Sequence, residues 1–146
     1  MQINGNWRLF ADGVLRPCVH LRVRLSENHW QEFPFLLDSG ADDTVLSADL
    51  LELVSHLENQ TATKIPLEGI GGAVDTILIE TVLGFIKDDG TTFEYPGRFS
   101  VFTEISSSDI SMLGRDVTDQ FKVIYDRPDS AVLLLSPPHR YEITAA

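Results

Sequence analysis

Apolar and polar residues alternate along most of this chain, which is the pattern expected of β-strands that bury one face. In residues 18–25 every second position is Val or Leu. Asp12-Gly13 and Asp89-Gly90 each stand between apolar runs, and both predict hairpins because glycine adopts a positive φ at little cost. Further strands are expected at residues 30–37, 65–79 (two arms), 99–102, 110–113, 123–125 and 132–135.

Two segments have a helical rather than a strand-like pattern. Residues 47–57 begin with Ser47, which can cap a helix, and carry apolar residues at positions 50, 53, 54 and 57. Residues 115–121 form a second, shorter candidate. No internal repeat or linker composition interrupts the chain. The sequence therefore predicts one domain over residues 1–146, an all-β (mainly β), barrel-like fold with one or two short helices.

Composition narrows the classes of function. The chain has 146 residues, 43% of them hydrophobic, and its longest apolar runs are only a few residues, so no spanning helix is expected. Its start lacks the pattern of a signal peptide, and the single cysteine, Cys18, cannot form an intrachain disulfide, so a cytoplasmic location is expected. The net charge of −11 argues against nucleic acid and membranes as partners, because both favour a basic face.

The segment with the clearest chemistry is residues 36–46, which read Leu-Leu-Asp-Ser-Gly-Ala-Asp-Asp-Thr-Val-Leu. Asp-Ser-Gly alone is most often a surface turn. Here the apolar flanks place the turn between two buried segments, where a carboxylate is costly to hold. Asp38 is therefore a candidate catalytic residue.

A glycine-rich turn, Gly69-Ile70-Gly71-Gly72, lies between two strand-like arms. Its glycines favour mobility, and the apolar side chain of Ile70 at the tip indicates that the turn packs against another surface or a ligand. A lid over a substrate fits this pattern, and an ordinary hairpin turn is the alternative. The four histidines are scattered without metal-ligand spacing, and no cofactor motif occurs, so neither a metal nor a cofactor is expected.

Taken together, these blocks resemble the retropepsins, the retroviral-type aspartic proteases. The loop at 36–46 is similar to their active-site loop, residues 69–72 to the tip of their flap, and Met112-Leu113-Gly114-Arg115-Asp116 to the segment that follows. Arg16-Pro17 precedes the catalytic turn, as in many retroviral enzymes. The resemblance covers about residues 16–125, and the N-terminal hairpin and C-terminal strand are additions that resemble cellular or bacterial members.

The resemblance implies a closed β-barrel that is half of an acid-protease active unit. Because the turn occurs once per chain and the chemistry needs two aspartates, it also implies a symmetric homodimer that cleaves polypeptides. The implied catalytic turn is Asp38, Ser39 and Gly40. The implied substrate-binding residues are Ala41, Asp42, Asp43, Val45, Gly69, Ile70, Gly71, Gly72 and Val117. The implied structural and dimer contacts are Arg16, Gly114 and Arg115, with Asp42 pairing with Arg115 of its own subunit and Arg16 of the other.

Two alternatives remain open at this point. The domain can be a peptide-binding or dimerisation module of the same fold with little or no catalysis. It can also be a monomer that acts only when concentrated or assembled with a partner. In viral enzymes the two termini interleave with those of the partner, and the extra hairpin and strand here predict a differently built interface.

Overall fold

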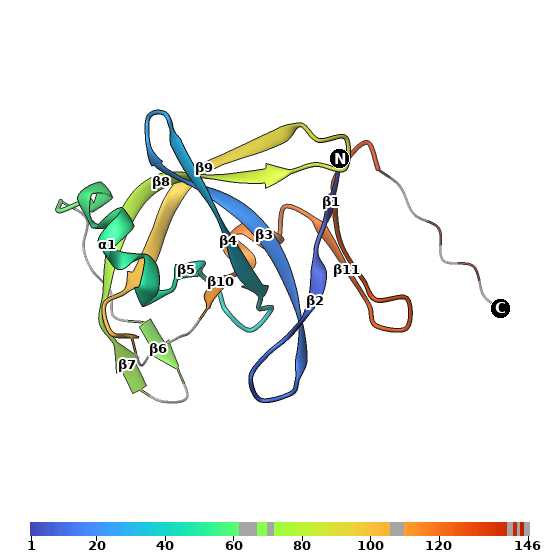
Figure 1. Cartoon of the computed structure of the whole chain (residues 1–146), viewed down its shortest axis with the longest axis horizontal. Coiled ribbons are helices and arrows are strands. Elements are labelled where there is room, and N and C mark those ends of the chain that lie inside the picture. Colours follow the sequence, from blue (N-terminus) through green and yellow to red (C-terminus); the bar gives the residue numbers. More distant parts are fainter. Residues whose placement is uncertain (62–66, 70–71, 106–109, 140–141, 143, 145–146) are drawn as a thin grey trace.

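The computed structural model describes residues 1–61, 67–69, 72–105, 110–139, 142 and 144. Strands dominate the fold (Figure 1). They are β1 (Gln2–Asn4), β2 (Asn6–Leu9), β3 (Leu15–Ser26), β4 (His29–Leu37), β5 (Val45–Leu46), β6 (Leu67–Gly69), β7 (Gly72–Val74), β8 (Thr76–Ile86), β9 (Thr92–Phe102), β10 (Ser111–Leu113), β11 (Lys122–Asp126) and β12 (Ala131–Leu135).

Six of these strands close into a barrel. Their order is β3, β4, β10, β5, β9 and β8, and β8 pairs back onto β3. Strand β10 runs parallel to β4, β5 runs parallel to β9, and the other neighbours are antiparallel. The closed, mainly β barrel expected from the sequence is confirmed.

The core lies inside the barrel and explains the period-two pattern. In β3 the side chains of Val19, Leu21 and Val23 are fully buried, and the residues between them are exposed. The largest fully buried side chains are Phe35, Phe85 and Phe99. Alternating burial is what a strand with one face on the core requires. Both Asp-Gly hairpins are present, and their glycines have positive φ as expected.

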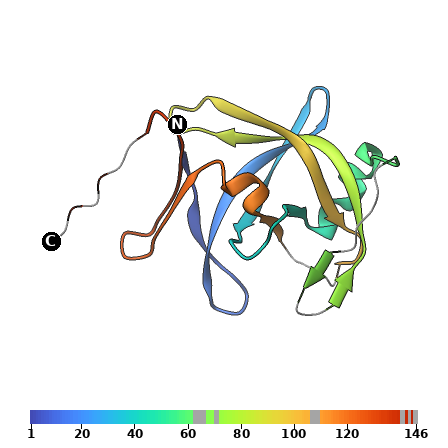
Figure 2. The same ribbon diagram turned by 180° about the vertical axis from the view of Figure 1, so that it is seen from behind.

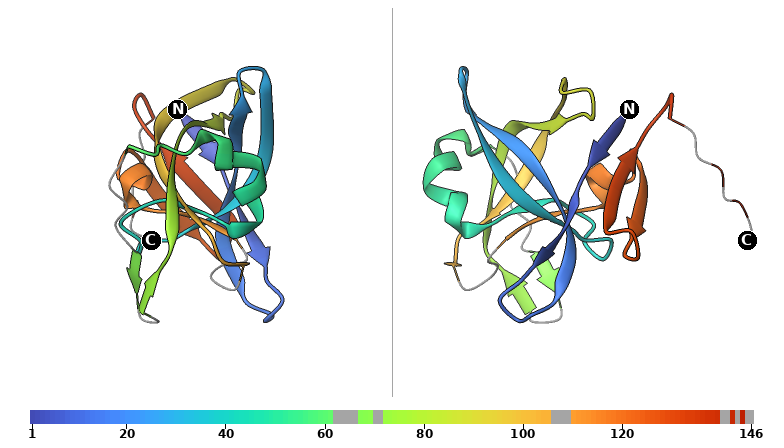
Figure 3. Two further views of the ribbon diagram at one scale, coloured as in Figure 1. Left: turned by 90° about the vertical axis from the view of Figure 1, so that its left-hand side faces the viewer. Right: turned by 45° about the vertical axis from the view of Figure 1, so that its right-hand side comes forward.

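A separate three-stranded sheet stands beside the barrel. Its order is β1, β12, β11, so the C-terminal strand lies between the first strand and β11. Gly5 joins this sheet to the barrel by donating its N–H to the carbonyl of Val132 at 2.8 Å. Figure 2 shows the sheet at one side of the molecule, and the right-hand view of Figure 3 shows its β11–β12 hairpin projecting next to β1 and β2.

The helical predictions need correction. Residues 47–57 form three short pieces rather than one helix: η1 (Ala48–Leu50), α1 (Leu51–Val54) and η2 (Ser55–Leu57). The helix breaks at Val54, whose φ is −117°. Val54 is β-branched and buried, and such a residue favours a departure from helical geometry. Ser47 does cap the segment, since its hydroxyl accepts the N–H of Asp49. The second helix, α2 (Arg115–Thr118), is shorter than predicted, and none of the helices described has the length and hydropathy needed to cross a bilayer.

Candidate active site

The turn that carries Asp38 is placed by two parallel strands. Because β4 and β10 run parallel with Leu37 beside Leu113, both strands end at the same level of the barrel. Asp38 follows β4 directly, and its N–H donates to the carbonyl of Leu113 at 3.2 Å. The candidate catalytic aspartate is therefore anchored by the sheet on its N-terminal side.

The turn itself is closed by its own hydrogen bonds. Gly40 donates its N–H to the Oδ1 atom of Asp38 at 3.0 Å, and Ala41 donates its N–H to the carbonyl of Asp38 at 3.2 Å. These bonds orient the carboxylate within an otherwise exposed turn, in which Ser39 and Gly40 face solvent. The tight turn predicted from the sequence is confirmed.

The rest of the loop is held against the start of α2. The N–H groups of Arg115 and Asp116 donate to the carbonyls of Ala41 and Asp42 at 2.9 and 3.0 Å. Gly114 makes this approach possible, because a Cβ atom there would lie 2.5 Å from the carbonyl carbon of Asp43. Any side chain at Gly114 would push the two segments apart.

A hydrogen bond from a buried hydroxyl to a half-buried carboxylate fixes the end of the loop. Thr44 is only 1% exposed, and its hydroxyl donates to Oδ1 of Asp116 at 2.7 Å while accepting the N–H of Gly114 at 3.0 Å. The same carboxylate oxygen accepts the N–H of Val117 at 2.9 Å. Both residues lie inside the sequence blocks that indicated the site, yet sequence reasoning gave neither a role, because their contact joins positions far apart in the chain.

The charged side chains around the loop form local pairs. Arg115 binds Asp42 at 2.8 Å, which confirms the pairing expected within one subunit. Both side chains are more than half exposed, so this pair orients the loop more than it stabilises the fold. Arg16 instead binds Asp12 of its own hairpin at 2.7 Å, and its hydrogen bond lowers the pKa of Asp12 to about 2. Its expected bond to Asp42 of a second subunit stays a prediction.

The apolar residues near the loop differ in how much surface they offer. Val117 is fully buried in the barrel core, so its expected role in contacting substrate does not fit the structure. Val45 is 3% exposed and belongs to a small cluster with Ala48 and Phe102. Val74 and Met112 pack on this cluster but are only partly buried. They are the better candidates for an apolar contact surface, and sequence reasoning missed both in this role.

The segment predicted to form a lid is a β-hairpin in the structure. Strands β6 and β7 pair antiparallel with Gly69 opposite Gly72, which confirms the two arms. Ile70 and Gly71, the expected tip, lie outside the described residues. Figure 1 shows this hairpin on the same lower side of the molecule as the loop after β4. A role as a cover over Asp38 stays a prediction.

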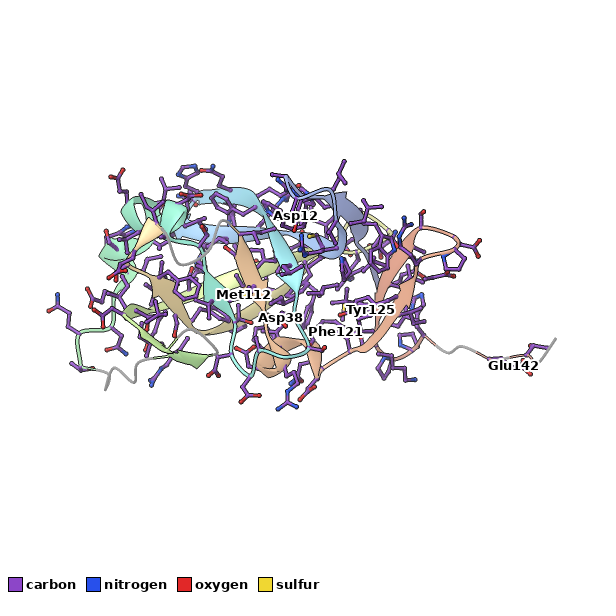
Figure 4. The ribbon with its side chains drawn as sticks, turned by 90° about the horizontal axis from the view of Figure 1, so that it is seen from below. Asp12, Asp38, Met112, Phe121, Tyr125 and Glu142 are labelled. Atoms are coloured by element: carbon purple, nitrogen blue, oxygen red, sulfur yellow. The ribbon has the colours of Figure 1, made fainter. Side chains whose placement is uncertain are left out.

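Tyr125, in β11, is an unforeseen neighbour of the candidate site. Burial raises the pKa of Tyr125, and the charge of Asp38 raises it further. The ring lies edge-on to Trp7 with centroids 6.3 Å apart, and 45% of the residue remains exposed. Figure 4 shows Asp38 and Tyr125 on one face of the molecule. No sequence motif signals this proximity, because it arises from how the small sheet packs beside the barrel.

The comparisons with known proteins agree with this geometry. Residues 14–125 match the family model described as retroviral aspartyl protease. The fold is similar to that of a retropepsin-like aspartic protease from Rickettsia conorii, with 21% identity, coverage of 92% of this chain and 89% of that chain, and a TM-score of 0.57. The EIAV protease complexed with the inhibitor HBY-793 is 24% identical over 71% of this chain and 86% of its own, with a TM-score of 0.48. No curated protein is detected as a relative.

Replacing Thr44 with valine should destabilise the fold. Valine keeps the shape but leaves the N–H of Gly114 without its acceptor and removes one of the two hydrogen bonds to Oδ1 of Asp116, which costs about 1–3 kcal/mol. Urea unfolding measures the change in the free energy of unfolding. Thr92→Val, at an exposed strand position, is the matched control and should change it by less than about 0.5 kcal/mol. Equal effects of the two substitutions would contradict the role given to Thr44.

Replacing Asp38 with asparagine should lower the pKa of Tyr125. The substitution removes the negative charge that disfavours the tyrosinate, and the part of the increase caused by burial should remain. NMR titration of ¹³C-labelled tyrosine rings measures the shift. Asp88→Asn, in the exposed β8–β9 turn, is the control and should leave the titration of Tyr125 unchanged. If the titration curve of Tyr125 is the same in Asp38→Asn as in the unaltered protein, the charge of Asp38 does not act on Tyr125 and the prediction is wrong.

Proposed function

This chain belongs to the retroviral aspartyl protease family, and we propose that it is an aspartic endopeptidase that works as a homodimer. The observation that carries the proposal is the placement of Asp38 on a closed turn between β4 and the start of α2. The chain holds one such turn, and hydrolysis of this type uses two carboxylates. A second copy of the chain would supply the other.

The proposed chemistry is general acid–base hydrolysis by the two Asp38 side chains. Two carboxylates about 3 Å apart cannot both ionise, so one binds a proton and the other stays charged; the aspartic proteases are the standard example of this behaviour. The charged carboxylate takes a proton from a water molecule, which attacks the peptide carbonyl. The protonated one donates to the carbonyl oxygen, and the amine leaves with a proton. No covalent intermediate forms.

The loop provides the remaining groups of the proposed site. Ser39 is exposed at the tip of the turn, where its hydroxyl is free to bond to the turn of the other subunit. Gly40, Asp42 and Asp43 are exposed next to it, and the proposed contacts to a substrate backbone are the carbonyl of Gly40 and the two carboxylates. Rigid attachment of the loop to α2 keeps these groups in place before substrate arrives.

The proposed substrate is an extended polypeptide with apolar side chains near the cleaved bond. Strand-like peptides bind by backbone hydrogen bonds to an enclosing hairpin, and β6–β7 is a hairpin of the right kind. The partly buried side chains of Val74 and Met112 offer apolar contacts. The tip of the proposed cover consists of Gly69, Ile70, Gly71 and Gly72.

We also propose that residues 1–146 act as one domain in the cytoplasm. Cys18 is a free thiol, and its burial raises its pKa, so it is poorly suited to redox chemistry. A reducing compartment suits such a chain. The net charge of −11 disfavours nucleic acid and anionic membranes as partners.

Asp38→Asn should lower peptide cleavage by about 10²-fold or more, because an amide can neither accept nor return the proton. The assay is cleavage of a proteome-derived peptide library between pH 4 and 7, read by mass spectrometry. Asp88→Asn, an exposed carboxylate on the far hairpin, should cleave as the unaltered protein does.

Undiminished cleavage by Asp38→Asn would overturn the proposed mechanism. Tight binding of library peptides with no cleavage by the unaltered protein would favour the peptide-binding alternative instead. Thermal unfolding of each variant shows whether the fold is intact.

A further inference from the structure

The loop of Asp38 is held by α2, a helix of only four residues. The N–H groups of Arg115 and Asp116 donate to the carbonyls of Ala41 and Asp42. A helix this short is not stable by itself, and its position depends on contacts with the rest of the protein. The groups that bind α2 from the barrel side therefore determine how firmly it holds the loop.

The hydroxyl of Tyr95, on β9, donates to the carbonyl of Asp116 at 3.2 Å. In a continuing α-helix this carbonyl would accept the N–H of Gln120, four residues on. The helix ends before that bond forms, and Gln120 donates to the carbonyl of Val117 at 3.1 Å instead. Carbonyls left free at a helix end need another donor. Tyr95 supplies that donor from the wall of the barrel.

Asp116 is thereby bound from two sides. On the side of the loop, its N–H donates to the carbonyl of Asp42 at 3.0 Å, and its Oδ1 atom accepts the hydroxyl of Thr44 at 2.7 Å. On the side of the barrel, its carbonyl accepts the hydroxyl of Tyr95. One residue therefore connects β9 to the loop between β4 and β5.

Tyr95 is itself firmly placed. Strand β9 pairs with β8 from Thr92 to Phe102 without a register shift, and Tyr95 stands opposite Leu83. Leu83 is fully buried, and the partly buried ring of Tyr95 packs against the same core. The hydroxyl is therefore a fixed point of the barrel against which Asp116 is positioned.

Two parts of the loop depend on α2 to different degrees. Asp38 donates its N–H to the carbonyl of Leu113, and the N–H of Gly40 donates to its carboxylate; neither bond involves Asp116. The backbone of Asp42 is bonded directly to Asp116. A shift of Asp116 should therefore displace Asp42, a proposed contact of the substrate backbone, more than Asp38.

We infer that Tyr95 is a positioning residue for the substrate-binding part of the loop. Its hydroxyl fixes Asp116, and Asp116 fixes the backbone of Asp42. Its role is indirect, through Asp116. The effect on cleavage rests on the proposed function, whereas the effect on the loop rests on the hydrogen bonds alone.

The first test is Tyr95→Phe, which removes the hydroxyl and keeps the ring. In cleavage of one library peptide, KM should rise about 3- to 10-fold, which corresponds to one lost hydrogen bond, and kcat should stay unchanged. Thr81→Val is the matched control, because it removes another hydroxyl–carbonyl bond, from Thr81 to Arg24 at 2.6 Å. A general loss of stability would affect both variants, and only the loss of positioning should raise KM.

The second test does not depend on cleavage. Amide hydrogen exchange, followed by NMR, reports how often the N–H groups of Arg115 and Asp116 leave the loop carbonyls. Tyr95→Phe should accelerate exchange at both amides at least about 3-fold relative to the N–H of Asp38. Thr81→Val should leave this ratio unchanged. Replacement of Tyr95 by p-aminophenylalanine, which keeps a donor on the ring, should restore the ratio.

The outcomes separate this inference from the proposed function. A folded Tyr95→Phe variant with unchanged exchange at Arg115 and Asp116 overturns the inference, as does an unchanged KM in an active protein. A fall in kcat at constant KM also overturns it, because the reacting groups rather than the substrate contacts would then be displaced. If the unaltered protein cleaves no peptide, the proposed function fails, and faster exchange in Tyr95→Phe still supports the role of Tyr95 in fixing the loop.

Discussion

The parallel pairing of β4 with β10 is the constraint on which the candidate site depends. It brings the ends of two strands that are distant in sequence to one level of the barrel. Asp38 and Gly114, the residues directly after these strands, therefore lie side by side. The loop after β4 then bonds to the first turn of α2, and the hydrogen bond from buried Thr44 to Asp116 fixes the far end of the loop. The half-buried carboxylate of Asp38 is thereby held on a rigid support.

In the proposed mechanism one chain supplies only one of the two carboxylates. Acid–base hydrolysis of a peptide by this mechanism needs a second carboxylate with a different protonation state.

Much of the fold could be predicted from local patterns. Alternation located the long strands, Asp-Gly located both hairpins, and the apolar flanks of residues 36–46 located the turn of Asp38. The length of the helix from Ser47 was wrong, because packing against the barrel overrides an apolar stripe of helical spacing. The burial of Val117 and the proximity of Tyr125 could not be predicted, since both follow from contacts between elements that no local pattern encodes.

The central claim is that two Asp38 side chains, one from each subunit, act together. Mixing unaltered subunits with Asp38→Asn subunits at constant total concentration tests it directly, since a mixed dimer holds one catalytic carboxylate. At equal proportions about one quarter of the dimers keep both aspartates by random association, and the cleavage rate should fall to about one quarter. A rate of about one half, proportional to the unaltered subunits, would show that each subunit acts alone and would contradict the account.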